Sequence, residues 1–545
     1  MTKCTTPSAS FPRCKGRQVI ARFDGGDLTS DGGILLLRQL DREMGLTRAV
    51  ARRLSDERDA QRCLHRTETL VRQRVFGLAL GYEDLNDHQA LRHDIALQTA
   101  VDTDGVLASQ STLCRFEQQA DRDWAITIHE EMIEQFIRSF RRPPKKPLYL
   151  DFDATDDRVH GQQLGRHFNG YYNHYIFLPL FVFCGDQLLV SYLRPASLDA
   201  AHHAGAILAL LVRRLRQAWP EVKIVFRGDS GFCRPLILNW CDRHGVDYII
   251  GLAGNKRLAK LALNIDYASA IRFEKTWEKE RVFGFIEYAA KSWKERRRKV
   301  IVKSETSRRG FNTRYVVTSL RGCSAEWLYD HRYCARGEME NRIKEQQFLF
   351  SDRTSCHEWR PNQYRLLLSG LAYLLLERLR YQVIHQLRAC HTRLLIIDEF
   401  HSLLTGGAVK QRETMNAIKL LCNELMIPIV GVGTQDAVRV LHSDPQHASR
   451  FDVVALPKWE LNQEFQKLLA GFEKILPLKH PSQLHEPQLA TQLHAISGGN
   501  LGDLHRLLIE CANAAILSGA ECIDEKIIQS KSWVRPTRGI REVML

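Results

Sequence analysis

Three acidic residues stand where their side chains could hold metal ions together. Asp153 lies next to the end of the mostly apolar segment LYLDFDA, Asp229 follows the segment VKIVFRG, and Glu340 lies in a later helical pattern. The strand ends of an open α/β sheet meet at one crevice, and a helix packed across it can add a third oxygen ligand. Mg²⁺ prefers carboxylate oxygens, waters and substrate phosphate, and two such ions can activate a nucleophile and stabilise a leaving oxygen. The pattern indicates metal-dependent phosphodiester chemistry, with Mn²⁺ as the alternative ion.

Acids at a strand end also fit a simpler interpretation. Asp151, Asp153, Asp156 and Asp157 could form nothing more than a polar loop. Residue types alone favour that loop over a metal site, so the neighbouring motifs have to decide. Asp151 stays open as the alternative to Asp153.

The elements that must position these acids follow from the hydrophobic pattern. Residues 30–46 and 67–82 repeat apolar side chains at helical spacing, which predicts a helical lobe over residues 1–142. The basic linker RRPPKKP ends this lobe, and residues 143–254 then alternate strands with helices, which predicts an α/β core. Short, densely charged strands predict a β-rich insertion over residues 255–320.

The segment LASQSTLCRFE predicts a capped helix within the lobe. Ser109 stands at the N-cap position. Polar residues follow on the first turns: Gln110, Ser111, Thr112 and Arg115. A helix that reads DNA has this form, and so does an ordinary surface helix, so both interpretations stay open.

The charge of the chain is unevenly distributed. The formal net charge is +14, and the basic and acidic residues balance from residue 387 to the end, so the whole excess belongs to residues 1–386. Each Lys or Arg that neutralises a phosphate releases condensed counterions, so a basic region of this size favours a nucleic-acid partner. A merely basic protein is the alternative.

Other features bound the class of protein. Apolar runs fall short of the roughly 18–20 residues that cross a bilayer, and no apolar segment follows the basic start, so we expect no membrane span, no secretory signal and a cytoplasmic location. The 14 cysteines include no Cys-x-x-Cys pair, which predicts neither a disulfide framework nor a structural zinc site.

Several longer motifs carry a resemblance to a known family. They are DFDATDD, HGQQLGRHFNGYYNHYIFLPLFVF, RGDSGFCRP, GVDYIIGLAGNKRL, YCARGEMENRIKEQQ and NQYRLLLSGLAYLLLERLR, spread over about residues 10–380. Together they resemble bacterial insertion-sequence transposases of the DDE class, most closely the family numbered thirteen-eighty. The resemblance implies an RNase H-like mixed sheet with a catalytic triad. It selects Asp153, which precedes Ala154-Thr155, and Asp229 in the motif RGDSGF.

The third acid of this class lies in a Tyr-x2-Arg-x3-Glu signature, matched here by Tyr333, Arg336 and Glu340. Residues 321–384 would then complete the core and carry the catalytic glutamate. Arg336, Glu340 and Lys344 are four residues apart and share one helix face. The resemblance implies that Tyr333, Arg336, Lys344 and Arg227 contact DNA phosphates. Related transposases carry a Lys seven residues after the Glu, where this chain has Gln347.

The resemblance also implies a DNA partner and an assembly. The substrates would be the element's terminal inverted repeats and a target duplex, cut and joined by a dimer on DNA. The insertion would lie over the DNA end, where Trp277, Trp293 and residues 296–299 suit stacking and phosphate contacts. A solvated charged hairpin is an equal alternative for this segment.

Residues 385–545 follow a different pattern. RLLIIDEFHSLL has the form of a Walker B strand, in which Asp398 would hold Mg²⁺ and Glu399 would polarise a water. Thr434 stands at a sensor position, Arg450 at an arginine-finger position and Arg506 at a second sensor position. This segment resembles the TniB-like AAA+ ATPases that accompany other transposons.

Nucleotide binding requires a glycine-rich loop with its lysine upstream of Walker B, and Gly-Lys occurs nowhere in this chain. The resemblance therefore implies a transposase fused to a truncated AAA+ α/β region with a helical lid, without ATP hydrolysis. An AAA+ regulator of transposition and an inactive fusion relic stay open as alternatives. A truncated sheet would also expose apolar surface.

Overall fold

The computed structural model describes residues 8–14, 17–22, 29, 31–59, 61–170, 172–294, 296–404, 408–442 and 450–530. The chain folds into two compact units. The first comprises Met1–Leu395 and Leu420–Ile429, and the second comprises Ile396–Lys419 and Val430–Leu545.

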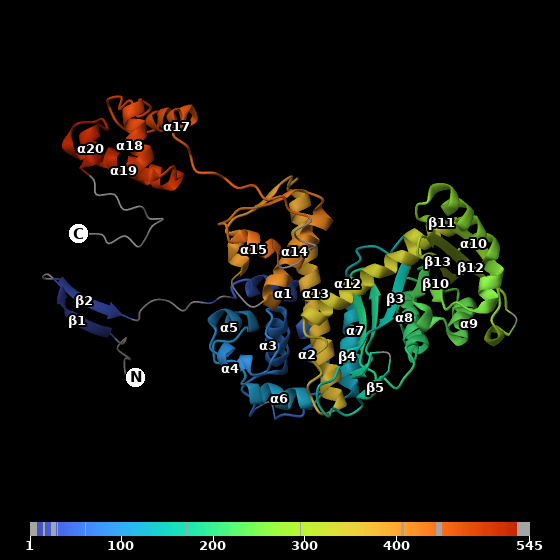
Figure 1. Cartoon of the computed structure of the whole chain (residues 1–545). Helices are drawn as coiled ribbons and strands as arrows, with labels where there is room; N and C mark the ends of the chain where they lie inside the picture. The colour runs from blue at the N-terminus through green and yellow to red at the C-terminus, as the bar shows by residue number, and fades with distance from the viewer. Residues whose placement is uncertain are drawn as a thin grey trace. The chain divides into compact units, whose positions relative to one another are not determined.

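A two-stranded hairpin and a helical lobe begin the first unit (Figure 1). The elements are β1 (Ser8–Cys14), β2 (Arg17–Arg22), α1 (Ile34–Met44), α2 (Leu46–Arg53), α3 (Thr67–Ala79), α4 (Asp87–Leu91), α5 (Ile95–Val101), α6 (Gln110–Gln118) and α7 (Arg122–Arg138). The predicted helix over 30–46 ends at Gly45, which adopts the left-handed conformation (φ +66°). Its N–H bonds to the Asp41 carbonyl at 2.7 Å, and α2 starts directly after it.

An eight-stranded sheet follows, in the order β11-β12-β13-β10-β9-β3-β7-β8. Its strands are β3 (Leu148–Ala154), β7 (Leu180–Cys184), β8 (Gln187–Tyr192), β9 (Ile224–Gly228), β10 (Asp247–Leu252), β11 (Glu280–Tyr288), β12 (Arg298–Ser307) and β13 (Gly310–Thr318). Strands β3, β9 and β10 are parallel, β7 is antiparallel to β3, and β8 is antiparallel to β7. The order β8-β7-β3-β9-β10 with these directions is that of an RNase H-like core, which confirms the predicted fold class.

Helices cover both faces of the sheet. Strands place successive side chains on opposite faces, so Leu150 and Phe152 of β3 pack into a core with α8 (Ala204–Ala218) and α9 (Pro235–His244). The other face of β7 and β8 shares a core with the helical lobe and with α13 (Trp359–Ala389), the long helix near the middle of Figure 1. Asp151 and Asp153 lie on the face opposite to Leu150 and Phe152.

Two short strands of the first unit come from one apolar run. The apolar run over residues 175–183 forms the end of β6 (His174–Phe177) and then β7, which belong to different sheets. Strand β6 pairs with β4 (Asp157–Arg158) and β5 (His167–Asn169) in a small three-stranded sheet. Pro179 separates the two strands, because it has no N–H with which to continue a ladder.

The segment after β10, predicted as a β-rich insertion, contains strands and also a helix that the sequence pattern did not predict. Instead of strands alone, it opens with the helix α10 (Lys256–Thr276), capped by Asn255, whose side chain accepts from the Arg257 and Leu258 N–H groups at 3.0 Å. Strands β11–β13 do follow, but β13 pairs with β10, so they extend the core sheet. Ser269 of α10 bonds to Ser304 and Thr306 on one face of these strands, which leaves their other face uncovered by this helix.

The second unit contains mostly helices. Its described elements include η5 (Phe400–Leu404), α15 (Ala437–His442), α17 (Gln463–Glu473), α18 (Pro487–Ser497), α19 (Leu501–Ser518) and α20 (Glu525–Gln529), and β14 (Leu395–Ile397), α14 (Ala408–Leu425) and β15 (Ile429–Gly431) cross the division. Helices α17–α20 share a core around Phe465, Leu493 and Leu507. Ile396 and Val430 are 59% and 43% exposed, as expected for a sheet that lacks covering elements. No helix in the described part of the chain is long and apolar enough to cross a membrane.

Candidate active site

The parallel pairing of β3 with β9 brings Asp153 and Asp229 to one edge of the sheet. In this register Asp151 lies opposite Arg227, and Phe152 lies opposite Gly228. The next pair along the two chains is therefore Asp153 and Asp229. Neighbouring strands are about 4.8 Å apart, so the two residues leave the sheet side by side.

A glycine allows the Asp229 loop to lie against the next strand. Asp229 caps the short helix η1 (Ser230–Phe232) by accepting from the Gly231 N–H at 2.8 Å. A Cβ on Gly251 of β10 would lie 2.8 Å from the Ser230 nitrogen and 2.7 Å from the Tyr333 hydroxyl. Gly251 thus permits a close contact that the sequence analysis did not predict. The feature of the sequence that could have indicated this contact is a lone glycine near the end of a strand. Asp229, Ser230, Gly251 and Tyr333 all line a pocket of about 340 Å³.

The segment that carries the third acid begins as irregular helix and becomes regular. It comprises α11 (Ala325–Leu328), the π-helix η3 (Tyr329–Tyr333), the 3₁₀ turn η4 (Cys334–Arg336) and α12 (Gly337–Phe348). Arg336 Nη1 donates to Asp153 Oδ2 at 3.0 Å, and its Nη2 donates to Glu340 Oε1 at 3.4 Å. The guanidinium therefore links the strand acid to the helix acid.

The charges of these groups influence one another. Burial raises the pKa of Asp153 to about 6; Arg336 opposes this rise, and the carboxylates of Asp229 and Glu340 add to it. Burial also acts to lower the pKa of Arg336, but Asp153, Asp229 and Glu340 outweigh it, so the pKa of Arg336 is raised. All three predicted acids thus lie within electrostatic reach of one arginine.

Asp151, the alternative to Asp153, has a different environment. It is 3% exposed, and Arg227 Nη2 donates to its Oδ2 at 2.7 Å, with a second, shorter bond from Arg227 Nε. Arg227 is expected among the phosphate contacts, but it is 8% exposed, and its remaining nitrogen donates to the Arg332 carbonyl. The pair therefore ties β3 and β9 to the segment that carries Tyr333, and neither residue is among those that line the pocket of about 340 Å³.

The donor set of the trio fits a hard divalent cation, because all its side-chain donors are carboxylate oxygens. In the described part of the chain, no three His, Cys, Asp or Glu side chains form a ready group for one metal ion. The Glu340 side chain is 56% exposed and lies 3.4 Å from Arg336 Nη2. Asp153 and Asp229 thus follow adjacent strands, and Glu340 is connected to Asp153 through the guanidinium of Arg336.

Helix α12 carries three further charged residues of interest. Lys344 and Glu338 are exposed on α12. The nearby Arg342 is buried and pairs with Asp186 and Glu345 at 2.8 Å. Arg342 thereby fixes α12 to the core, while Lys344 remains accessible.

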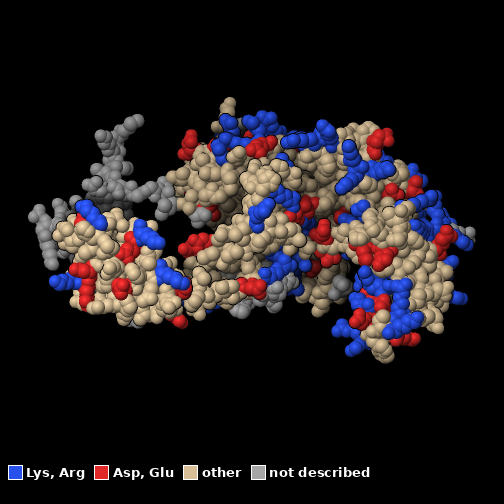
Figure 2. Space-filling model, turned by 90° about the horizontal axis from the view of Figure 1, so that it is seen from above, with Lys and Arg blue, Asp and Glu red and all other residues tan. Residues whose placement is uncertain are grey.

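Basic side chains gather at the right-hand end of the molecule in Figure 2, where Figure 1 places β11–β13 and α10, with acidic side chains interspersed. Trp277 is 66% exposed there. Trp293 is only 4% exposed and packs against Tyr288, so it is not available to stack on a base. Arg298 is likewise buried and pairs with Asp242 at 2.6 Å.

Ser109 is the N-cap of helix α6, and its hydroxyl accepts from the Thr112 N–H at 3.4 Å, which confirms the predicted cap. Gln110, Ser111 and Arg115 are exposed, whereas Leu113 is buried. The outward face is therefore polar, and its role in reading DNA stays a prediction.

The predicted nucleotide-site remnants lie in the second unit. Asp398, Glu399, Thr434, Arg450 and Arg506 are all exposed. His401 connects two of them, because its Nε2 lies 3.2 Å from Glu399 Oε2 and its Nδ1 lies 3.3 Å from the Thr434 nitrogen. The neighbouring HASRFD motif is described only from Arg450 onward, and Arg506 lies on α19.

Asp157, in β4, is a buried acid close to the candidate site in sequence. It is 2% exposed, and neither of its carboxylate oxygens nor the nearby Thr354 hydroxyl has a partner in hydrogen-bonding geometry among the described residues. Burial raises its pKa from 3.8 to about 8, Thr354 partly offsets this, and Asp352 adds to it. Asp157 is therefore neutral in the fold at pH 7.

Replacing Asp157 with asparagine is expected to stabilise the chain near pH 8. Between about pH 4 and about pH 8 the unfolded state has released a proton that the folded state keeps, so stability falls as pH rises. Asn removes this loss, and 1 kcal/mol shifts the melting midpoint by about 2–4 °C. Thermal melting should show a gain of several degrees at about pH 8 and a smaller change at about pH 5. The less buried Asp156→Asn is the control, and an equal shift at both pH values would contradict the assignment.

The sequence matches two protein families. Residues 11–400 match the family described as transposase DDE domain group 1, and residues 372–461 match the bacterial TniB protein family. No curated protein matches the sequence. Among solved structures, the chain is similar to the piggyBac transposase in a synaptic complex with hairpin DNA, at 10% identity and a TM-score of 0.35, over 83% of this chain and 92% of that chain.

Proposed function

Because the chain belongs to the transposase family with a group 1 DDE domain and carries a TniB segment at its C-terminal side, we propose that it cuts DNA at the ends of its mobile element and joins the freed 3′ ends to target DNA. One observation carries the proposal. Asp153 and Asp229 leave adjacent parallel strands together, and Arg336 connects Asp153 to Glu340.

Asp153, Asp229 and Glu340 would hold Mg²⁺, with Mn²⁺ as the alternative. When bound, the ions supply an activated water and stabilise the leaving oxygen. Binding of cations to the acids would release the Arg336 guanidinium, which can then clamp a phosphate through two parallel hydrogen bonds. Tyr333, whose hydroxyl lies over Gly251, can donate to the same phosphate.

The DNA partner would be the terminal inverted repeat and then the target duplex. The exposed residues on helix α6 and the exposed Lys344 on α12 are the candidates for duplex contacts beyond the scissile phosphate. We propose that two chains act together, because both ends of an element have to be joined to one target. The TniB-like segment is proposed to bind no ATP, because the chain contains no Gly-Lys.

A cleavage assay tests this proposal. The full chain is incubated with a labelled duplex that carries the inverted repeat flanking the reading frame. Nicking at the repeat boundary is expected in Mg²⁺ or Mn²⁺ and not in EDTA. A folded chain that binds the duplex but never cuts it would instead favour the inactive fusion relic. A chain that cuts equally in EDTA would contradict the metal-dependent mechanism.

A further inference from the structure

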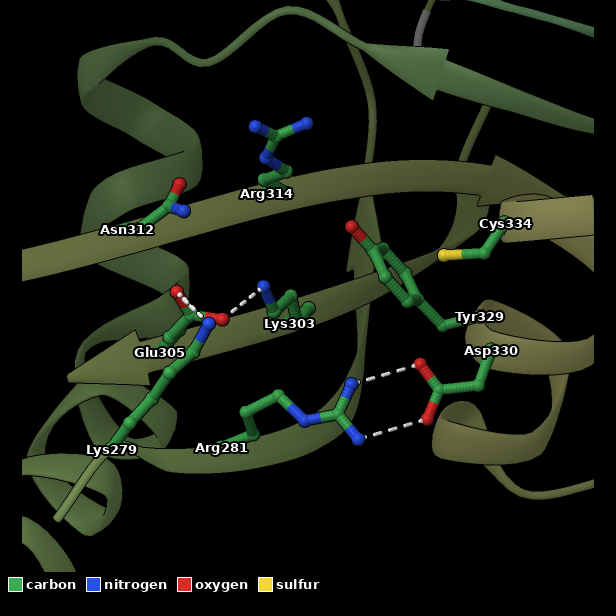
Figure 3. A pocket seen from close by; sticks show the side chains of 9 residues that line it. All are labelled: Lys279, Arg281, Lys303, Glu305, Asn312, Arg314, Tyr329, Asp330 and Cys334. Atoms are coloured by element: carbon green, nitrogen blue, oxygen red, sulfur yellow. Dashed lines mark hydrogen bonds and ion pairs between the residues drawn. The ribbon is translucent and has the colours of Figure 1, made fainter. Parts of the chain in front are cut away.

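A second pocket, of about 490 Å³, lies on the face of β11–β13 opposite to α10 (Figure 3). Its lining residues come from the three strands, from the turn before β11 and from η3 and η4: Lys279, Arg281, Lys303, Glu305, Asn312, Arg314, Tyr329, Asp330 and Cys334. Four of these side chains are cationic and two are anionic. The pocket therefore carries an excess of positive charge.

Strand pairing places like charges opposite each other. Lys303 of β12 lies directly opposite Arg314 of β13 in the antiparallel register. Like charges in this position destabilise a sheet. Lys303 is also only 8% exposed, so its ammonium group has lost most of its water. Such an arrangement is costly for folding alone and suits a site that receives an anion.

The two acids of the pocket neutralise only some of its cations. Glu305 accepts from Lys303 at 2.6 Å and lies 3.1 Å from the Lys279 ammonium. Asp330 pairs with Arg281 through two bonds, at 3.0 and 3.2 Å. These ion pairs, drawn as dashed lines in Figure 3, hold Lys279, Lys303 and Arg281 in place.

Among the described residues that line this pocket, Arg314 is the cation without an ion pair. Its exposed guanidinium has no hydrogen-bond or ion-pair partner among the side chains that the structure describes, and Figure 3 draws none for it. Arg314 also lines the smaller pocket with Asp229, Tyr333 and Arg336. The two pockets therefore meet at Arg314, with the Tyr329–Tyr333 segment beside them.

Resting on the proposed function, we propose that this cationic pocket binds a backbone phosphate of the DNA strand that continues from the cleavage site, with Arg314 as its principal contact. A guanidinium presents a planar fork that matches phosphate oxygens, and the surrounding ion pairs keep the neighbouring cations from moving away. Arg314 lies outside the Tyr-x2-Arg-x3-Glu signature, and Cys334 is the residue of that signature segment that lines the pocket. A free inorganic phosphate has the same oxygen chemistry, so the test includes it.

The test measures binding without cleavage. Fluorescence anisotropy of a labelled inverted-repeat duplex is recorded with the full chain in Ca²⁺, from about 50 to about 200 mM KCl. Arg314→Gln is expected to weaken binding about tenfold, since a charge-assisted hydrogen bond is lost. It should also lower the slope of log affinity against log salt by about 0.9, the value for one lost phosphate contact. Arg314→Lys, which keeps the charge, should retain most of the slope.

The matched control is Arg213→Gln, an exposed arginine on α8 at the other face of the sheet, which should leave the slope unchanged. The proposal is overturned if Arg314→Gln has the parental affinity and slope. It is also overturned if millimolar inorganic phosphate lowers the duplex affinity of the parent chain to that of Arg314→Gln, because the pocket would then be a site for the free anion. Because cleavage is measured separately, a chain that shows the slope change but never cuts DNA would refute the proposed function and leave this inference standing.

Discussion

Replacing Asp229 with alanine is expected to lower the rate of inverted-repeat cleavage by about three orders of magnitude, while DNA binding stays close to that of the parent chain. A lost metal-holding carboxylate removes several kcal/mol of transition-state stabilisation. Each loss of about 1.4 kcal/mol slows a reaction tenfold. Single-turnover cleavage in Mg²⁺ measures the rate, and anisotropy in Ca²⁺ measures binding.

The role of Asp229 as a cap has to be separated from its chemistry. Its Oδ1 accepts from the Gly231 N–H, so alanine also costs about 1 kcal/mol of local stability. Asp229→Asn keeps an acceptor at this position and should melt like the parent chain, yet be equally slow. Glu338→Gln, an exposed acid on α12, is the matched control and should cut normally. Cleavage by Asp229→Asn at the parental rate would refute the assignment.

The acids could be found from sequence because each one has a local signal. Asp153 and Asp229 both follow apolar runs that form adjacent strands, and the register that places them together is that of a parallel pair. Glu340 lies four residues after Arg336, so a helical pattern already places the two side chains on one face. What local pattern could not supply is the contact of Arg336 with Asp153, since it joins residues that are 183 positions apart.

The choice between Asp151 and Asp153 shows the limit of local pattern. Both residues lie on the same face of β3, because strand side chains alternate with a period of two. They differ in what the neighbouring strand presents, which is Arg227 opposite Asp151. That buried pair removes Asp151 from the open site. Only the register of β9 against β3 carries this information, and no spacing within the motif DFDATDD encodes it.

The secondary structure and burial of the highly charged segments were the features of the fold that the sequence predicted least well. Helix α10 carries Leu258, Ala262 and Ser269 at buried positions with helical spacing, but the dense charges on its other faces obscure the pattern. Trp293 illustrates the same difficulty, because a tryptophan beside arginines also suits DNA stacking. It is buried in the structure since Tyr288 and Arg298 pack against its ring.

Replacing Gly251 with alanine is expected to slow cleavage about 100-fold and to lower the melting midpoint, although Gly251 bears no chemical group. The added Cβ would lie 2.7 Å from the Tyr333 hydroxyl, 2.8 Å from the Ser230 nitrogen and 3.1 Å from the Asp229 carbonyl carbon. Two of these three atoms belong to the backbone and cannot rotate away, so the Asp229 loop has to move. Overpacking of this kind costs about 1–3 kcal/mol, and a misplacement of about 1 Å can cost 100-fold in rate.

Gly254→Ala is the matched control for this substitution, because its Cβ would lie 3.5 Å from the Tyr315 ring, an ordinary contact. It should melt and cut like the parent chain. The double variant Gly251→Ala with Tyr333→Phe removes the closest atom but leaves both backbone atoms in place, so it should recover part of the stability and little of the rate. Parental cleavage by Gly251→Ala would mean that the Asp229 loop can shift without loss. The close packing of β10 against that loop would then have no part in positioning the acid.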